Sequence, residues 1–253
     1  MTLLTDYGLD DAYVGAVKGV LYARGGAGLR VADLTHSVPP QDVRSAAFHL
    51  AHAWRWYPPG TVHVAVCDPG VGTEREVLVA LFEGHAFLAP DNGLLGPVLG
   101  EGADVRALDV ERFALPGMSR TFHGRDVFAP AAAALAGGLD PRAAGRARPA
   151  WRRAAFPAPE ADGEAWVATV LSIDRFGNLV GNVPAERVAQ GRWRAVVRDR
   201  RAPLLGTYGE GRPGELLALV DSYGLVELAV RDGSAARDLG LKPGDRFRLE
   251  RDA

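Results

Sequence analysis

The sequence predicts an α/β N-terminal domain, with a largely parallel sheet covered by helices, followed by a small antiparallel β-barrel domain. Over the first half of the chain, short apolar runs alternate with longer amphipathic stretches, as strands and their covering helices do. Residues 140–163 are rich in Pro, Ala and Arg, which is typical of a boundary between domains. We therefore expect domains at residues 1–145 and 164–253, joined by a linker at 146–163.

Strand and helix patterns alternate along the N-terminal half. The apolar run at 2–5 predicts a strand, and Asp10 and Asp11 are expected to cap the helix that follows. A second strand at 30–34 precedes a helix over 41–57. The later elements are expected in this order: a strand at 62–66, a hairpin within 76–84 and 85–93, a short helix at 94–99, a strand at 105–110, and an Ala-rich helix ending at Gly137-Gly138.

The C-terminal third contains short strand-like runs separated by turn residues, a pattern that indicates a small antiparallel barrel. Helical periodicity recurs there only around 235–239. The runs are AWVATVLSID, NLVGNV, RWRAVV, ELLALVDS, GLVELAV and FRLE.

An aspartate follows three of the predicted strands: Asp6, Asp68 and Asp91. In α/β sheets the ligand crevice lies beyond the carboxyl ends of the strands, where loops present side chains from a rigid base. The loop after the third strand, DPGVG, also leads to Arg75, so it could bring a carboxylate and a guanidinium to one site. The alternative is a surface turn with an ion pair.

A second polar loop, TFHGRD, precedes the Ala-rich helix and contains His123 and Gly124. The unpaired amides of a first helical turn favour anions and polar ligands, so this loop is a candidate site. The alternative is that Thr121 or Asp126 simply caps the helix.

Composition restricts the function classes. The net charge of −2 over 253 residues does not indicate nucleic acid or an anionic membrane as a partner. The single cysteine, Cys67, excludes an internal disulfide and is expected to be a buried small apolar residue rather than a nucleophile. No targeting or membrane-spanning pattern is apparent, so we expect a soluble, cytoplasmic protein. His49 and His52 lack a third ligand nearby, and no metal site is expected.

Seven motifs carry a resemblance to a known family. In order they are LTDYGLDDAYVGAVKGV, VADLTHSVPPQDVRSAA, PPGTVHVAVCDPGVGTER, APDNGLL, TFHGRDVFAPAAA, SIDRFGNLVGN and DSYGLVELAV. Together they resemble the S-adenosylmethionine (SAM) hydrolases, also called SAM hydroxide adenosyltransferases, which are related to enzymes that fluorinate or chlorinate the same compound. One such motif is weak evidence, but seven in order are specific.

The resemblance implies hydrolysis of SAM to adenosine and methionine, without a cofactor, in a homotrimer whose sites lie between subunits. It implies that Asp68, Arg75 and His123 handle the attacking water. Asp6 would hold the ribose hydroxyls, and Asp174 and Asn178 would contact the methionine end. The implied substrate-binding residues are Asp6, Phe122, Gly124, Asp174, Phe176, Asn178, Ser222 and Arg231; position 231 is Arg where the family more often has Asn.

The chemistry explains these residue types. Displacement at the ribose C5′ releases a neutral thioether, so methionine needs no general acid to leave. Water, with a pKa of about 15.7, is a poor nucleophile and must be held in line with the C5′–S bond. Arg75 could stabilise developing hydroxide, while either Asp68 or His123 accepts the proton. The residues do not decide between those two acceptors.

Three other function classes fit the sequence less well. In the fluorinating relatives the positions of Asp68, His123 and Gly124 carry Tyr, Tyr and Ser, and all three differ here, which favours water over a halide. A non-catalytic SAM or adenosine sensor would not need the complete Asp, Arg and His set. A dinucleotide-dependent oxidoreductase would need a G-x-G-x-x-G fingerprint after the first strand, which TDYGLDD lacks.

Overall fold

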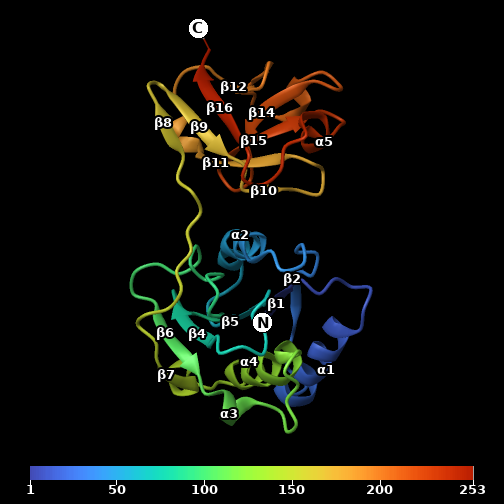
Figure 1. Ribbon diagram of the computed structural model, residues 1–253, viewed down its shortest axis with the longest axis vertical. Coiled ribbons are helices and arrows are strands. Elements are labelled where there is room, and N and C mark those ends of the chain that lie inside the picture. The colour runs from blue at the N-terminus through green and yellow to red at the C-terminus, as the bar shows by residue number, and fades with distance from the viewer. Residues whose placement is uncertain (253) are drawn as a thin grey trace. The chain divides into compact units, whose positions relative to one another are not determined.

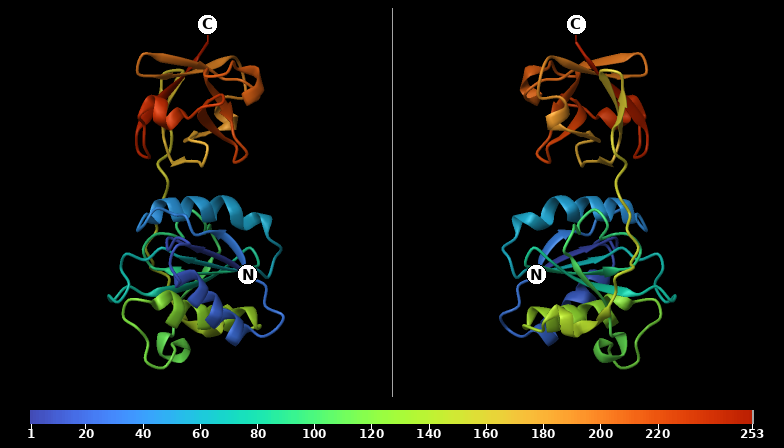
Figure 2. Two further views of the ribbon diagram at one scale, coloured as in Figure 1. Left: turned by 90° about the vertical axis from the view of Figure 1, so that its right-hand side faces the viewer. Right: turned by 90° about the vertical axis from the view of Figure 1, so that its left-hand side faces the viewer.

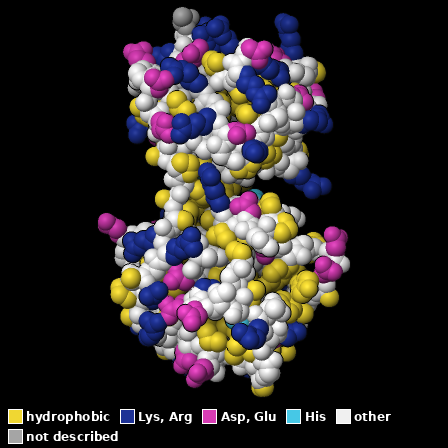
Figure 3. Space-filling model, in the orientation of Figure 1, with side chains coloured by type: hydrophobic (Ala, Val, Ile, Leu, Met, Phe, Trp, Pro, Cys, Tyr) yellow, Lys and Arg dark blue, Asp and Glu magenta, His cyan; other side chains and the backbone are white. Residues whose placement is uncertain are grey.

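The computed structural model describes residues 1–252, and the chain divides into two compact units between Ala155 and Phe156. On the face shown in Figure 3, basic and acidic side chains are interspersed over the surface of each unit. No helix among residues 1–252 combines the length and the apolar character needed to cross a bilayer.

A mixed seven-stranded sheet forms the centre of the first unit (Figure 1). Its strands are β1 (Thr2–Thr5), β2 (Ala32–Thr35), β3 (Val62–Val66), β4 (Val77–Phe82), β5 (His85–Pro90), β6 (Asp104–Leu108) and β7 (Gly145–Ala147). The order is β2-β1-β3-β5-β4-β6-β7, parallel from β2 to β5 and antiparallel from β5 to β7. The predicted α/β fold is confirmed, and β4 and β5 are the predicted hairpin.

Helices cover both faces of this sheet. They are α1 (Tyr13–Gly25), α2 (Val43–Ala53), η1 (Trp54–Trp56), α3 (Val110–Phe113), η2 (Gly124–Phe128), α4 (Ala129–Ala136) and η3 (Pro141–Ala144). Figures 1 and 2 show α2 on one face and α1 with α4 on the other. Buried residues of α1, α4 and the central strands form one apolar core, which includes Leu3, Val17, Leu21, Val64 and Phe128.

Three local predictions need correction. Residues 94–98 form turns instead of the helix expected at 94–99, because Pro97 lacks the backbone N–H that a helix would use there. Asp10 and Asp11 do not cap α1, because the capping position is Ala12 and no side chain caps it. The Ala-rich helix begins with a π-helical turn, η2, before α4, and such turns are frequent at functional sites.

The second unit is built from two antiparallel sheets around one core, as the β prediction expected. One sheet has the order β10 (Ser172–Ile173), β11 (Leu179–Pro184), β15 (Leu225–Val230) and β14 (Leu216–Val220). The other has the order β13 (Arg200–Pro203), β12 (Trp193–Val197), β16 (Arg246–Arg251), β9 (Ala165–Thr169) and β8 (Glu160–Asp162). Their shared core includes Leu179, Ala195, Leu228 and Phe247.

Short helices complete the second unit: η4 (Ala185–Arg187), η5 (Tyr208–Glu210) and α5 (Ala235–Leu239). The helix expected around 235–239 is confirmed as α5, which Ser234 caps and Gly240 ends in the left-handed conformation. The two ends of the segment at 146–163 lie in strands, β7 and β8, which pair with β6 and β9.

Candidate active site

The carboxyl ends of the neighbouring parallel strands β1 and β3 bring Asp6 and Asp68 to one edge of the first sheet. Both side chains line a cavity of about 610 Å³. This volume falls within the range of roughly 300–1,000 Å³ usual for small-molecule sites. The other residues that line it include Tyr7, Tyr13, Pro40, Gln41, Ser119, Phe122, Gly124 and Arg125.

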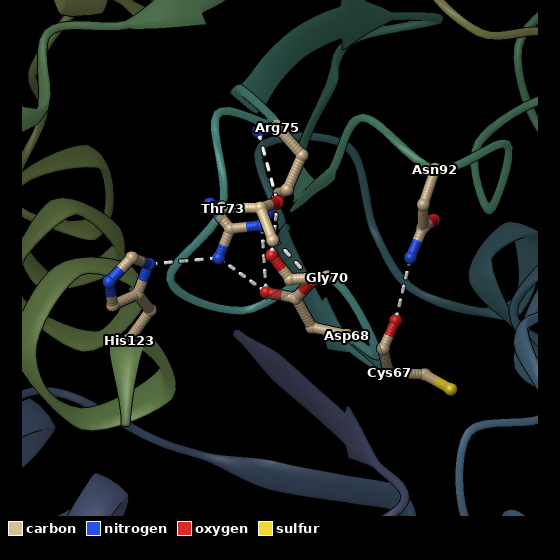
Figure 4. A network of polar contacts seen from close by, with 7 residues as sticks. All are labelled: Cys67, Asp68, Gly70, Thr73, Arg75, Asn92 and His123. Atoms are coloured by element: carbon tan, nitrogen blue, oxygen red, sulfur yellow. Dashed lines mark hydrogen bonds and ion pairs between the residues drawn. The ribbon is translucent and has the colours of Figure 1, made fainter. Parts of the chain in front are cut away.

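Arg75 lies between Asp68 and His123 and bonds to both (Figure 4). Its Nε donates to Asp68 Oδ1 and Oδ2 at 3.0 and 2.9 Å, and its Nη2 also donates to Asp68 Oδ2. The same Nη2 donates to His123 Nδ1 at 2.9 Å. The side chains of Arg75 and Asp68 are only 11% and 5% exposed, so water screens their attraction weakly.

The loop that carries this ion pair depends on glycine at one position. Gly72 has φ of 76°, and a Cβ there would lie 2.3 Å from the carbonyl oxygen of Arg120. A side chain at this position would be strained by the backbone and would collide with the neighbouring loop. Thr73 Oγ1 donates to Gly70 O at 2.7 Å and tightens the same turn (Figure 4). The loop is therefore a rigid support for Asp68 and Arg75.

The contact with Arg75 determines the protonation state of His123. A guanidinium only donates, so His123 Nδ1 must accept, and the ring is neutral with its proton on Nε2. Burial, with the adjacent Arg75 charge as the second cause, lowers the pKa of His123 below its ordinary value of 6.5. His123 does not belong to the residues that line the cavity, whereas Asp68 does. Asp68 is thus the member of the group that faces the ligand space.

Asp6 is held by its surroundings at the same edge. The Gln41 backbone N–H donates to Asp6 Oδ2 at 2.8 Å, and Gln41 has φ of 68°, which is uncommon for a residue other than glycine. Cys67 Sγ lies 3.5 Å from the same oxygen. Cys67 is fully buried, as predicted, and burial followed by the charge of Asp6 raises its pKa.

An aromatic group forms one wall of the cavity. The rings of Tyr7 and Tyr13 have centroids 5.9 and 5.1 Å from that of Phe122, with edge-to-face geometry. Tyr7 also packs against Gly124, where a Cβ would lie 2.3 Å from the Tyr7 hydroxyl oxygen. Burial, followed by the charges of Asp6 and Asp68, raises the pKa of Tyr7. Sequence reasoning missed Tyr13, for which its position two residues after Asp11 offered no signal.

Asp91, the third aspartate at a strand end, has a structural role. It accepts from the Arg152 backbone N–H at 2.7 Å, and Arg148 Nη2 lies 3.5 Å from its other oxygen. The neighbouring Asn92 donates to the Cys67 carbonyl at 2.8 Å (Figure 4). These contacts anchor the segment after β7 and support the end of β3, away from the ligand space.

The second unit gathers most of the other predicted substrate-binding residues. Phe176, Asn178 and Arg231 line a cavity of about 500 Å³ in that unit. Asp174 accepts from the Asn178 side chain at 2.9 Å and from two backbone N–H groups of its own turn. Ser222 lies in an exposed turn after β14 and does not line this cavity. The predicted residues therefore form two groups, one in each unit.

A buried carboxyl group in the second unit was missed by sequence reasoning. Tyr208 donates to Glu227 Oε1 at 2.5 Å, and Glu227 is 2% exposed. Burial raises the pKa of Glu227 to about 7, and the charges of Asp221 and Asp174 add to this rise, although the Tyr208 bond opposes it. The available signal was the charged residue within the apolar run LVELAV.

The described residues, 1–252, contain no group of three or more His, Cys, Asp or Glu side chains arranged to hold a metal ion.

Comparisons with known proteins point to one family. The model described as "SAM hydroxide adenosyltransferase N-terminal domain" matches residues 1–145, and the corresponding C-terminal model matches residues 168–248. Proteins named (R)-S-adenosyl-L-methionine hydrolase are similar: one from Thermus thermophilus is 43% identical over 97% of both chains, and one from Salinispora tropica is 44% identical over 98% of this chain and 97% of its own.

Similarity extends to solved structures and to a second kind of enzyme. A crystal structure of an uncharacterized conserved protein from Thermotoga maritima matches with a TM-score of 0.91 and 34% identity over 99% of both chains. A protein from Actinoplanes sp. named fluorinase is less similar, with 26% identity over 96% of this chain and 95% of its own.

Proposed function

Because the chain belongs to the SAM hydroxide adenosyltransferase family, we propose that it hydrolyses S-adenosyl-L-methionine to adenosine and L-methionine. The observation that carries this proposal is the chain of contacts from Asp68 through Arg75 to His123, with Asp68 facing the cavity. Relatives of similar length named as hydrolases of this compound support the choice of substrate.

The proposed step is a single displacement at the ribose C5′. A water oxygen forms a bond to C5′ as the C5′–S bond breaks, and that electron pair goes to sulfur to give neutral methionine thioether. Asp68 accepts the water proton, because its carboxylate lines the cavity while the lone pair of His123 Nδ1 is already bonded to Arg75. Arg75, bonded to Asp68 beside the cavity, supplies the positive charge that stabilises the developing hydroxide next to that carboxylate, and His123 orients Arg75.

Asp6 is proposed to accept hydrogen bonds from the ribose hydroxyls, since charge-assisted bonds of this kind fix a nucleoside firmly. Phe122 and Gly124 line the same cavity. The remaining proposed contacts come from the second unit, and by family resemblance we assign them to a neighbouring subunit of a homotrimer. They are Asp174, Phe176, Asn178, Ser222 and Arg231.

We further propose that the enzyme is cytoplasmic and needs no cofactor. We propose neither nucleic acid nor a membrane as a partner, and the nearly balanced net charge of −2 supports this part of the proposal. Sedimentation tests the assembly: an active monomer would remove the homotrimer from the proposal.

The sulfonium sulfur of SAM is a stereocentre, and the names of the relatives specify the (R) form. We propose the same preference here, because a rigid in-line site accepts one orientation of the leaving group better than the other. Supplying a mixture of both sulfur epimers and following each by chromatography tests this preference. Equal consumption of the two would contradict it.

The central experiment incubates purified protein with both SAM epimers and measures adenosine and methionine by liquid chromatography. Asp68→Ala should lower the rate by on the order of 10² or more while SAM still binds. Asp104→Ala is a matched control, because Asp104 of β6 forms ion pairs with Arg106 of β6 and Arg142 of η3 and does not line the cavity. Failure to form adenosine at any pH from mildly acidic to alkaline would exclude the hydrolase.

The halogenase alternative is tested in the same assay. With chloride present, a halogenase would form 5′-chloro-5′-deoxyadenosine in place of adenosine. We expect adenosine alone, because an acid–base group such as Asp68 serves water and repels a halide anion at close range.

A further inference from the structure

His36, in the loop after β2, is buried; its Nδ1 and its carbonyl group form hydrogen bonds, and its Nε2 has an ion-pair contact. Nδ1 lies 2.8 Å from Thr5 Oγ1, and Nε2 lies 3.1 Å from Asp33 Oδ1. The His36 carbonyl accepts from the backbone N–H of Gly8 at 2.9 Å. Thr5 and Gly8 flank the turn that carries Asp6, so His36 holds this turn on both sides.

The hydrogen bonds of His36 have a defined direction. Asp33 can only accept, and it already accepts from Lys18 Nζ at 2.7 Å, so its charge favours the His36 proton on Nε2, although this contact lacks the geometry of a hydrogen bond. In the neutral ring, Nδ1 then accepts from the Thr5 hydroxyl. This leaves Thr5 Oγ1 free to accept from the Tyr7 backbone N–H at 3.3 Å. The chain of hydrogen bonds therefore begins at the Tyr7 backbone N–H, next to Asp6, and runs through Thr5 to His36.

The other end of the same loop contacts Asp6 directly. The Gln41 N–H donates to Asp6 Oδ2 at 2.8 Å from a left-handed backbone conformation, φ of 68°. A residue other than glycine keeps such a conformation only where its surroundings enforce it, and such positions cluster at functional sites. His36 is not among the residues that line the cavity, whereas Gln41 is.

We propose that the loop at 36–41 presents Asp6 to the ribose, with His36 and Thr5 as positioning residues that act through the Asp6 turn. This inference rests on the proposed function, because it uses the ribose role of Asp6. The Asp6 bond to ribose is made equally in the ground state and the transition state, so loosening the turn should weaken binding. The KM for SAM and the Kd for adenosine should rise, while kcat should change little.

Thr5→Val tests the proposal with an isosteric change. Loss of one hydrogen bond predicts a rise of about fivefold in the Kd for adenosine, measured by titration calorimetry. Thr2→Val is the matched control, because Thr2 Oγ1 makes the same kind of bond, 2.8 Å to His63 Nδ1, at the other end of the same strand. Both variants should melt at a lower temperature, but only Thr5→Val should lose affinity.

Repeating Thr5→Val in a chain that carries Asp6→Ala distinguishes an effect on the position of Asp6 from an effect on the stability of the fold. There Thr5→Val should change the Kd by less than about twofold, because the group that it positions is gone, although the melting temperature still falls. If Thr5→Val weakens binding equally in both backgrounds, or not at all in wild type, the positioning role is overturned. If Asp6→Ala itself leaves the Kd unchanged, the ribose role fails and this inference fails with it.

Two substitutions of His36 give a further check. His36→Asn places an acceptor near the position of Nδ1 and should keep the Kd within about twofold of wild type. His36→Gln reaches towards Asp33 but offers Thr5 no acceptor, and should match Thr5→Val. The reverse ranking would show that the contact with Asp33, and not the one with Thr5, matters for binding.

Discussion

The two ends of the central parallel strands carry similar polar chemistry but differ in what surrounds it. At the carboxyl end, the Thr5–His36 bond supports a turn whose carboxylate faces a cavity. At the amino end, Thr2 bonds to His63, whose Nε2 lies 3.1 Å from His85 Nδ1. A buried Thr–His pair is therefore not a sign of a site by itself.

Aromatic rings close the amino end. His63 is stacked on Phe87 with centroids 5.0 Å apart, and Trp54 packs against His85 at 5.1 Å. The side chains of His63 and His85 are 0% and 4% exposed. Burial, followed by the neighbouring His85, lowers the pKa of His63 to about 3. This end is a neutral part of the core, and what distinguishes the other end is its charged groups and its opening to a cavity.

The largest expected difference is in kcat, between a His→Gln substitution at the carboxyl end of the strands and the same substitution at their amino end. His123→Gln removes the acceptor for Arg75, and misplacing Arg75 predicts a fall in kcat on the order of a hundredfold. His85→Gln, at the amino end, should leave kcat unchanged. His123→Asn, which keeps an acceptor near Nδ1, should recover activity to within roughly tenfold of wild type. Steady-state kinetics measures kcat for all three variants. Equal losses of kcat in both His→Gln variants would show that the two ends do not differ in their importance for the reaction.

The amino end should control the acid stability of the fold. The pKa of His63 is about 3 when folded and 6.5 when unfolded, so the unfolded state binds more protons between these values and stability falls as pH drops from 6.5 towards 3. At pH 5 the loss from this residue amounts to about 2 kcal/mol relative to neutral pH. Urea unfolding at several pH values measures it.

His63→Gln should flatten this dependence on pH, and the control His52→Gln, on α2, should not. A wild-type free energy of unfolding that stays constant between pH 6.5 and 5 would contradict the assignment.

Packing at the carboxyl end should exclude a serine at position 124. Gly124→Ser would push its Cβ against the Tyr7 hydroxyl, and overpacking here predicts a fall of about tenfold in kcat/KM. Tyr7→Phe in the same chain should recover part of the loss. Gly19→Ser, at an α1 position with open space around it, is the control. If the double variant is no better than Gly124→Ser, steric conflict with Tyr7 is not the cause.

The smallest expected effect is a shift, to lower pH, of the point at which kcat/KM begins to decline in acid. His123 must be neutral to accept from Arg75, and its pKa is lowered below 6.5 by burial and by Arg75. As pH falls, kcat/KM should therefore stay constant through 6.5 and decline only below it. The profile of kcat/KM against pH measures the midpoint. A midpoint at or above 6.5 would mean that the ring is more easily protonated than its surroundings imply.

Local patterns predicted the architecture well, because alternation of apolar residues reports burial directly. They also placed Asp6 and Asp68 at strand ends and marked the loop with His123 as a candidate site, and the family resemblance added the role of His123. The contacts of His36 could not be predicted, since a bond between side chains 31 residues apart depends on register and rotamer. Similarly, nothing in the composition of the Ala-rich helix indicates the π-helical turn at its start.

Cys67 has a practical consequence. It is the single cysteine of the chain, fully buried, and lies 3.5 Å from Asp6. Thiol reagents attack the thiolate, which burial disfavours here, so labelling requires the strand edge around Asp6 to open. The labelling rate of unmodified protein therefore measures how often the structure around Asp6 opens. Adenosine bound at Asp6 as proposed should slow this labelling without any engineered probe.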